Sequence, residues 1–192
     1  MRIVEEVDKK IVAHLQKDGR ITLTELSKTT GYTSMGVKKR IERLLREEVI
    51  KVTALLNVDK IRLCAAVVML EMEDADALGN LLERFKNCPR VVNIFSTFGG
   101  YNLIALVVAE DQETLESISI EKCSLRSCKG IRRSEFYPIG AIHFSHFLPV
   151  REYLANKERA QAPCNVDCRP CTRYRLQKCV ACPATRYYRG TL

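Results

Sequence analysis

Hydrophobic residues recur at helical spacing along the N-terminal part of the chain. Over residues 4–17, apolar side chains at i, i+4, i+5 and i+8 form one stripe, which predicts an amphipathic helix ending at Asp18 and Gly19. The stripe consists of Val7, Ile11, Val12 and Leu15.

Two further helices joined by a tight turn are predicted from residue 22 onward. Thr22 and Glu25 form a capping box that starts the first of them, and Gly31 permits the left-handed backbone that ends it. Thr33 or Ser34 caps the second helix. The apolar stripe of that second helix consists of Val37, Ile41, Leu44 and Leu45.

The outer face of this last helix carries candidate DNA-binding residues. Lysine and arginine side chains suit phosphate groups, and the first-turn side chains of a helix in the major groove reach base edges. The alternative is an ordinary amphipathic hairpin with a solvated basic face. The candidate contacts are Thr33, Ser34, Met35, Lys38, Lys39 and Arg43.

From residue 49 onward the pattern becomes that of β-strands. Residues 49–56 are rich in β-branched side chains and predict a strand, either a wing or a connector that pairs with a partner subunit. Residues 64–137 follow the order β-α-β-β-α-β, which predicts a ferredoxin-like antiparallel sheet with helices on one face. The predicted strands are 64–72, 91–98, 101–110 and 131–139, and the predicted helices are 75–85 and one that Asp111 caps.

The first and third of these strands are nearly continuous apolar runs. Such strands are buried on both faces of a sheet, and the two helices cover only one face. A second copy of the sheet is the simplest cover for the other face. We therefore expect a homodimer or a higher homo-oligomer.

Charge is spread unevenly along the 192 residues. Residues 1–60 carry 13 Lys and Arg against 9 Asp and Glu, residues 61–150 carry 9 against 11, and residues 151–192 carry 9 against 3. The basic ends indicate a nucleic-acid partner and the middle a different role. The chain shows no apolar run of membrane-spanning length and no signal-peptide pattern, so we expect a cytoplasmic protein with no membrane partner.

Nine cysteines in such a chain indicate metal or redox chemistry more than a disulfide framework. Cys64 and Cys88 are expected to be buried or incidental thiols, and Cys123 and Cys128 flank a loop where pairing is one alternative. The other five cysteines have the spacing C-x3-C-x2-C-x7-C-x2-C. They are Cys164, Cys168, Cys171, Cys179 and Cys182.

Two C-x2-C pairs are typical of sites that hold a tetrahedral ion or a cluster. Zinc on the last four of these cysteines is slightly favoured. An iron–sulfur cluster is the rival, because Cys182-Pro183 and the three closely spaced cysteines are similar to ferredoxin ligation. The alternative to both is an unstructured basic tail with spare thiols.

Residues 3–62 resemble the DNA-binding domain of the Lrp/AsnC (feast/famine) family of prokaryotic transcriptional regulators. The resemblance rests on Asp8, the run Asp18-Gly19-Arg20, Gly31, the pair Arg40-Ile41 and the pair Val49-Ile50. Glu48 departs from the family pattern, which has glycine there, where the recognition helix must end.

The same resemblance implies that the following domain is an effector-sensing RAM domain. Such domains dimerise through their sheets, and many bind small effectors, typically amino acids, between subunits. The run FGGYNLI resembles the family's glycine-containing turn, with Asn102 in place of the usual aspartate, and an amide offers no charge to an amino group. The implied effector-binding residues are Gly99, Gly100, Tyr101 and Asn102; the alternative is that two glycines merely close a hairpin.

The sequence thus predicts an α+β protein with a helix-turn-helix domain, a ferredoxin-like (RAM/ACT-like) domain and a small Cys-rich metal-binding tail. We expect a sequence-specific regulator of the Lrp/AsnC type that binds double-stranded DNA, is not an enzyme, and responds to metal or redox state through its tail. The alternative is a metabolite-binding or iron–sulfur redox protein whose N-terminal helices mediate protein contacts. The predicted boundaries are 1–52 (DNA binding), 53–63 (linker strand), 64–149 (effector and oligomerisation), 150–163 (linker helix) and 164–192 (tail).

Overall fold

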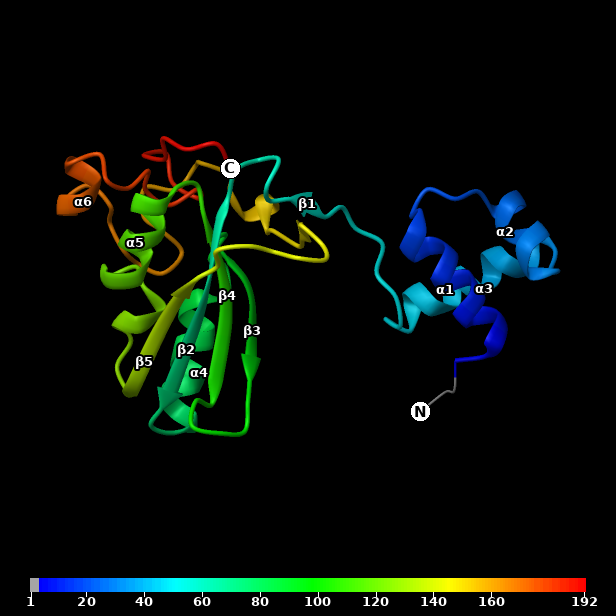
Figure 1. Cartoon of the computed structure of the whole chain (residues 1–192), viewed down its shortest axis with the longest axis horizontal. Coiled ribbons are helices and arrows are strands. Elements are labelled where there is room, and N and C mark those ends of the chain that lie inside the picture. Colours follow the sequence, from blue (N-terminus) through cyan, green and yellow to red (C-terminus); the bar gives the residue numbers. More distant parts are fainter. Residues whose placement is uncertain (1–3) are drawn as a thin grey trace. The chain divides into compact units, whose positions relative to one another are not determined.

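The computed structural model describes residues 4–192, and the chain forms two compact units that divide after Ala54. The first unit contains three helices, α1 (Glu6–Lys17), α2 (Leu23–Thr30) and α3 (Ser34–Arg46) (Figure 1). Ile11, Leu26 and Val37, one from each helix, form its buried centre. The helical spacing of apolar residues therefore predicted this unit correctly.

The predicted helix caps are confirmed. The Thr22–Glu25 capping box starts α2, and Gly31 ends it with a φ of 76°. The predicted stripe of α3 is wrong at Leu45, which is 41% exposed. Val37 and Leu44 are buried and define the inner face, and Leu45 is turned by about 100° from its neighbour Leu44.

Within this chain, the strand predicted over residues 49–56 forms only at its end, and its pairing with a partner subunit stays a prediction. Only β1 (Leu56–Asn57) forms, and it pairs with β6 (Phe147–Leu148). Val49, Val52 and Leu55 are exposed, since the described part of the chain offers residues 49–55 no partner strand. The β-branched composition was the only basis for this prediction, and composition does not supply a hydrogen-bonding partner.

The second unit, residues 55–192, is built on the predicted β-α-β-β-α-β order. Its four-stranded antiparallel sheet has the strand order β3-β4-β2-β5 (Figure 1). The elements are β2 (Cys64–Met72), α4 (Ala75–Phe85), β3 (Val91–Ser96), β4 (Leu103–Ala109), α5 (Gln112–Ile120), the 3₁₀ turn η1 (Leu125–Ser127) and β5 (Ile131–Pro138).

Both helices cover the same face of this sheet. Leu81 and Phe85 of α4 and Leu115 of α5 pack against Val68 and Leu70 of β2. On the opposite face, one end of the sheet is covered by the chain itself. There Val58, Leu63, Ile142, Leu148 and Leu192 pack around Ala65 and Val108. A second copy is therefore not needed at that end.

The C-terminal residues extend the core on the helix-covered side. Ala162, Cys164, Val166 and Cys182 pack with the residues beneath α4 and α5. Residues 150–163, predicted as a linker helix, contain the 3₁₀ turn η2 (Glu152–Leu154) and an isolated β-bridge from Arg159 to Thr185. The tail contains the short helix α6 (Thr172–Arg175). Across residues 4–192, no helix combines the length and the apolar character needed to cross a membrane.

Candidate DNA-binding, effector and thiol sites

The N-terminal half of α3 presents an exposed polar and basic surface. The Thr33 side chain accepts a hydrogen bond from the Gly36 N–H at 3.1 Å, which fixes the start of the helix. Met35 is 61% exposed, and Lys38 and Lys39 are exposed on the following turn. These side chains are exposed, as contact with a major groove would require, and Ser34 beside them is half-buried.

A buried carboxylate holds α3 against α1. Asp8 is fully buried and accepts hydrogen bonds from Arg40 and Arg43, with 3.0 Å between Arg40 Nη1 and Asp8 Oδ1. Burial by itself raises the pKa of Asp8, but the hydrogen bonds from Arg40 and the Glu5 N–H outweigh it and hold the pKa below its usual value. Asp8 is therefore an ionised anchor for two arginines.

This arrangement revises the prediction for Arg43. Its side chain is 23% exposed and its guanidinium is paired with Asp8, so it points into the helical unit and not toward a ligand. In the sequence, Asp8 was identified only as one of the positions that match the family pattern. A single charged residue one turn before the apolar Ile11, on the same helix face, was the signal for its inward role.

Glu48 resolves the question of how the recognition helix ends. It adopts a φ of 54°, so a residue with a β-carbon occupies the left-handed region that the chain needs there. The exit geometry expected of a glycine is therefore kept, and the glutamate bears the conformational strain.

The turn at residues 99–102 lies at one end of the sheet. The Asn102 side chain donates to the Met72 carbonyl at 2.9 Å and accepts from the Met72 N–H at 2.7 Å, so it completes the end of β2. The Tyr101 hydroxyl donates to Glu135 and lowers the pKa of that carboxyl. The Arg133 guanidinium lies 4.3 Å from the centre of the Tyr101 ring. A phenol and two opposite charges thus converge beside the turn.

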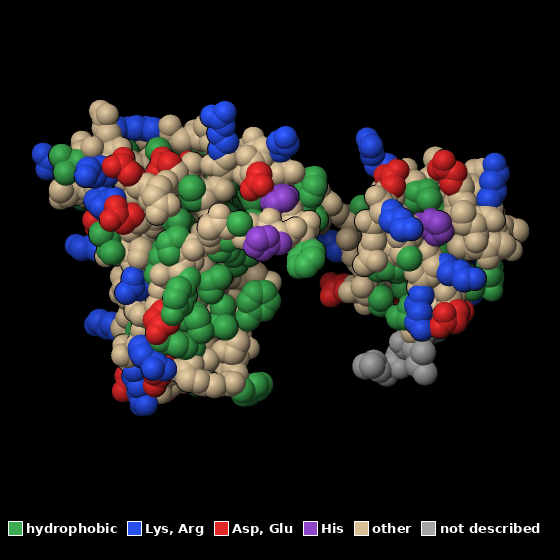
Figure 2. Space-filling model, in the orientation of Figure 1, with side chains coloured by type: hydrophobic (Ala, Val, Ile, Leu, Met, Phe, Trp, Pro, Cys, Tyr) green, Lys and Arg blue, Asp and Glu red, His purple; other side chains and the backbone are tan. Residues whose placement is uncertain are grey.

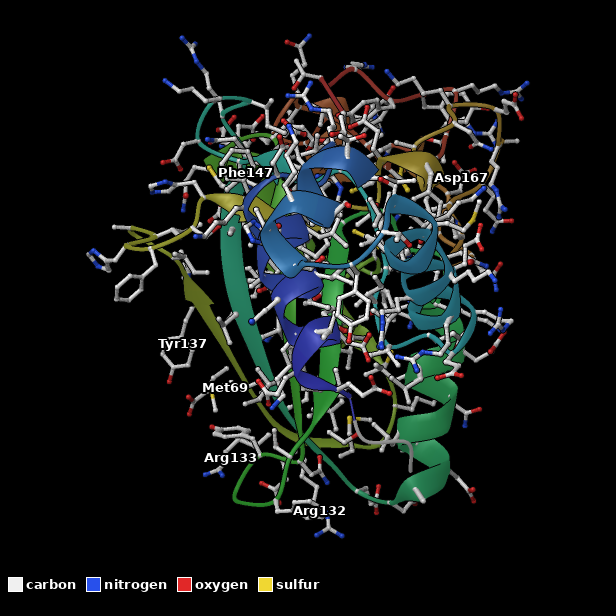
Figure 3. All side chains as sticks on the ribbon, turned by 90° about the vertical axis from the view of Figure 1, so that its right-hand side faces the viewer. Met69, Arg132, Arg133, Tyr137, Phe147 and Asp167 are labelled. Carbon is white, nitrogen blue, oxygen red and sulfur yellow. The ribbon has the colours of Figure 1, made fainter. Side chains whose placement is uncertain are left out.

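The part of the sheet face that the chain does not cover is apolar. Strand register places Phe95 beside Ile104, Ile104 beside Met69, and Leu106 beside Val67. Tyr137 pairs with Val67 at the β5 edge and is 50% exposed. Figure 2 shows hydrophobic side chains gathered on the front of the sheet, and Figure 3 shows Met69 and Tyr137 on the side away from Asp167. Contiguous apolar surface of this kind is typical of a protein interface.

Four of the five tail cysteines line one cavity. Cys164, Cys168, Cys179 and Cys182 surround it, and two cysteines from the body of the second unit, Cys88 and Cys123, line it as well. Its volume of about 50 Å³ exceeds the roughly 10–15 Å³ that one water molecule needs. Cys171 faces an adjoining hollow that shares Cys123, Cys168 and Cys179 with this cavity.

No disulfide joins the cysteines of this cavity. All nine cysteines are free, so the alternative of a Cys123–Cys128 disulfide is not realised. Among residues 4–192, no three His, Cys, Asp or Glu side chains converge in an arrangement that would hold a metal ion. Burial raises the pKa of Cys164 to about 11 and that of Cys182 to about 12.

Two family models match the chain, a winged helix-turn-helix DNA-binding model over residues 4–51 and an Lrp/AsnC ligand binding domain over residues 65–139. The HTH-type transcriptional regulator FL11 of Pyrococcus furiosus is 30% identical over 116 residues, which is 60% of this chain and 77% of the relative. An uncharacterised HTH-type transcriptional regulator of Pyrococcus abyssi is 30% identical over 134 residues, which is 69% of this chain and 83% of the relative.

Solved structures show the same fold. The E. coli AsnC structure matches with a TM-score of 0.63 at 15% identity and covers 76% of this chain and 99% of its own. The complex of a Neisseria meningitidis transcriptional regulator with L-Met matches with a TM-score of 0.67 at 20% identity, covering 79% and 99%. Residues 140–192 lie beyond both matched family models.

Proposed function

Because this chain belongs to the Lrp/AsnC family of DNA-binding transcriptional regulators, we propose that it reads the major groove with the exposed N-terminal half of α3. The observation that carries the proposal is the exposure of Met35, Lys38 and Lys39 on a helix whose opposite side is anchored by Asp8. Lysine side chains neutralise phosphates, and side chains of the first turn reach base edges. Thr33 and Ser34 complete the proposed contact set.

Arg43 is left out of this set, because its guanidinium is held by the buried Asp8 carboxylate. Its proposed role is to fix the orientation of α3. A rigid recognition helix lowers the conformational cost of binding, since less order has to be imposed when DNA is bound.

A mobility-shift experiment tests this proposal. DNA fragments selected by the protein from a random pool are titrated with the wild type, with Lys38→Ala/Lys39→Ala, and with Lys10→Ala as the control on α1. We expect the double variant to bind more weakly. The slope of log affinity against log salt concentration is expected to decrease by the amount that corresponds to about two phosphate contacts. Binding equal to that of the wild type would contradict the assignment of α3.

We further propose that two chains pair through the uncovered apolar sheet face around Met69 and Ile104. The register that aligns Phe95, Ile104 and Met69 across three strands supports this, because such a surface loses its contact with water when a second copy covers it. A two-fold dimer carries two α3 helices, so its DNA half-sites are expected about 10–10.5 bp apart, or at multiples of that distance.

For the ligand-binding domain, we propose that the turn at residues 99–102 borders the effector site. The Asn102 side chain already hydrogen-bonds the Met72 backbone. The charged groups of an effector would therefore be bound by Arg133 and Glu135, which lie beside Tyr101. Opposite charges side by side suit a zwitterion such as an amino acid. Thermal-shift titration with the twenty amino acids tests this, with a response that is lost in Glu135→Gln as the expected result and no response to any of them as the contradiction.

A further inference from the structure

The cavity beneath the tail brings together thiols from two distant parts of the second unit. Cys88 follows α4, and Cys164, Cys168, Cys179 and Cys182 belong to the tail. The remaining walls are apolar side chains such as Val68, Phe85 and Val107. The cysteine spacing of the tail does not predict that Cys88 lies in the same cavity, because Cys88 is 76 residues before the first tail cysteine.

The backbone next to these cysteines is held in costly conformations. Asn165 has a φ of 62° and Ala181 a φ of 68°, although neither is glycine. Left-handed backbone is unfavourable at Ala181, which has a β-carbon, whereas asparagine adopts it more readily than most residues; residues held in this region are concentrated at functional sites. Each of these residues directly adjoins a cysteine of the cavity, so the strain lies where the sulfur atoms are positioned.

Contacts with the body of the unit hold the second C-x2-C pair in place. The buried Arg90 donates to the Ala181 carbonyl and pairs with Glu110. On the other side, Ser117 Oγ lies 2.8 Å from the Lys178 carbonyl oxygen. These contacts fix Cys179 and Cys182 over the cavity from both flanks.

We propose that this cavity binds a thiolate-ligated metal centre whose four ligands are Cys88 and three of the tail cysteines Cys164, Cys168, Cys179 and Cys182. Loading requires these side chains to rotate toward the cavity centre, because among residues 4–192 no three of them converge on one point. Thiolate ligands select soft metals, which here means zinc or the iron of an iron–sulfur cluster. Each cysteine that binds releases its proton to solvent, so loading is expected to weaken as the pH falls. The assigned set leaves out Cys171, which lines the adjoining hollow and not this cavity. The proposal is independent of DNA binding.

Metal loading of the full chain tests the proposal. Anaerobic, metal-free protein is given Zn²⁺ alone in one arm and Fe²⁺ with sulfide in the other, and metal per chain is measured after desalting. The expected result is stoichiometric zinc in the first arm, or iron and sulfide in comparable amounts with visible absorbance in the second. The first result identifies a zinc site and the second a cluster site. Retention of neither would overturn the proposal.

Two measurements test the role of Cys88. Cys88→Ser is expected to weaken loading at least about tenfold, whereas Cys64→Ser, a half-buried thiol outside the cavity, loads like the wild type. Wild-type protein is also alkylated with iodoacetamide with and without metal and mapped by mass spectrometry, which does not depend on the folding of a variant. Metal is expected to protect Cys88 but not Cys64. Equal alkylation of Cys88 in both states would overturn its assignment.

Discussion

The carboxylate of Asp8 in α1 lies 3.0 Å from the guanidinium of Arg40 in α3, and Asp8 is fully buried. Thirty-two residues separate the two along the chain. Their contact, with the second bond from Arg43, fixes the recognition helix to the helix behind it. The proposed DNA-binding surface therefore depends on an ion pair between α1 and α3.

Removing this carboxylate is expected to destabilise the first unit. Asp8→Ala leaves two arginines without their buried partner, a loss of about 3–5 kcal/mol in the free energy of unfolding. Urea denaturation followed by circular dichroism measures it, with Asp18→Ala as the control because that carboxylate is exposed. A cost below about 1 kcal/mol for Asp8→Ala would show that the pair does not anchor α3.

The same pair gives the first unit an acid sensitivity. The pKa of Asp8 is lower in the folded chain than its ordinary value of 3.8. Its contribution is therefore fully present above that ordinary pKa and is lost as the pH falls from there through the folded pKa. In urea denaturation at decreasing pH, the free energy of unfolding should fall more for the wild type than for Asp8→Asn over this acid range. An equal fall in both proteins would contradict Asp8 as the origin of the acid sensitivity.

Glu48 offers a stabilising substitution. Its φ of 54° suits glycine, so Glu48→Gly relieves left-handed strain and is expected to raise stability by roughly 0.5–1 kcal/mol after the entropic cost of glycine. Glu48→Ala removes the same side chain without relieving the strain and is the matched control. If both variants behave alike in thermal melts, the side chain and not the backbone determines the effect.

The uncovered sheet face predicts the effect of a charge on assembly. Met69→Lys places an ammonium group among Ile104, Phe95 and their neighbours, where burial against a second copy would be unfavourable. Light scattering is expected to show a smaller assembly than for wild type. Leu82→Lys, on the exposed side of α4, should leave the mass unchanged. An unchanged mass for Met69→Lys would place the interface elsewhere.

Two sets of metal ligands are proposed, one from the cavity in the structure and one from the cysteine spacing. They differ at Cys171. Its thiol faces the adjoining hollow and not the cavity shared by the other four tail cysteines. Cys171→Ser is therefore expected to retain metal at the wild-type level, and Cys182→Ser to lose most of it. Loss of metal in Cys171→Ser would favour the ligand set expected from the two C-x2-C pairs.

The sequence predicted β2 and α4 with the boundaries that the structure shows, because a long apolar run and a regular helical stripe are local signals. Residues 49–55 pair with no described strand of the same chain, and whether they pair with a partner subunit is a question that composition does not answer. The pairing of Arg43 with Asp8 and the position of Cys88 beside the tail cysteines were not predicted, for a related reason. Each depends on residues distant in the chain.

The central claim is that α3 of a paired protein reads specific DNA. Footprinting on the DNA selected by the wild-type protein tests it most directly. We predict protected half-sites whose centres lie about 10–10.5 bp apart or at multiples of that spacing, with protection in the major groove that is lost in Lys38→Ala/Lys39→Ala. Uniform, salt-sensitive retention of any DNA with no footprint, or a footprint unaffected by the double substitution, would contradict this account.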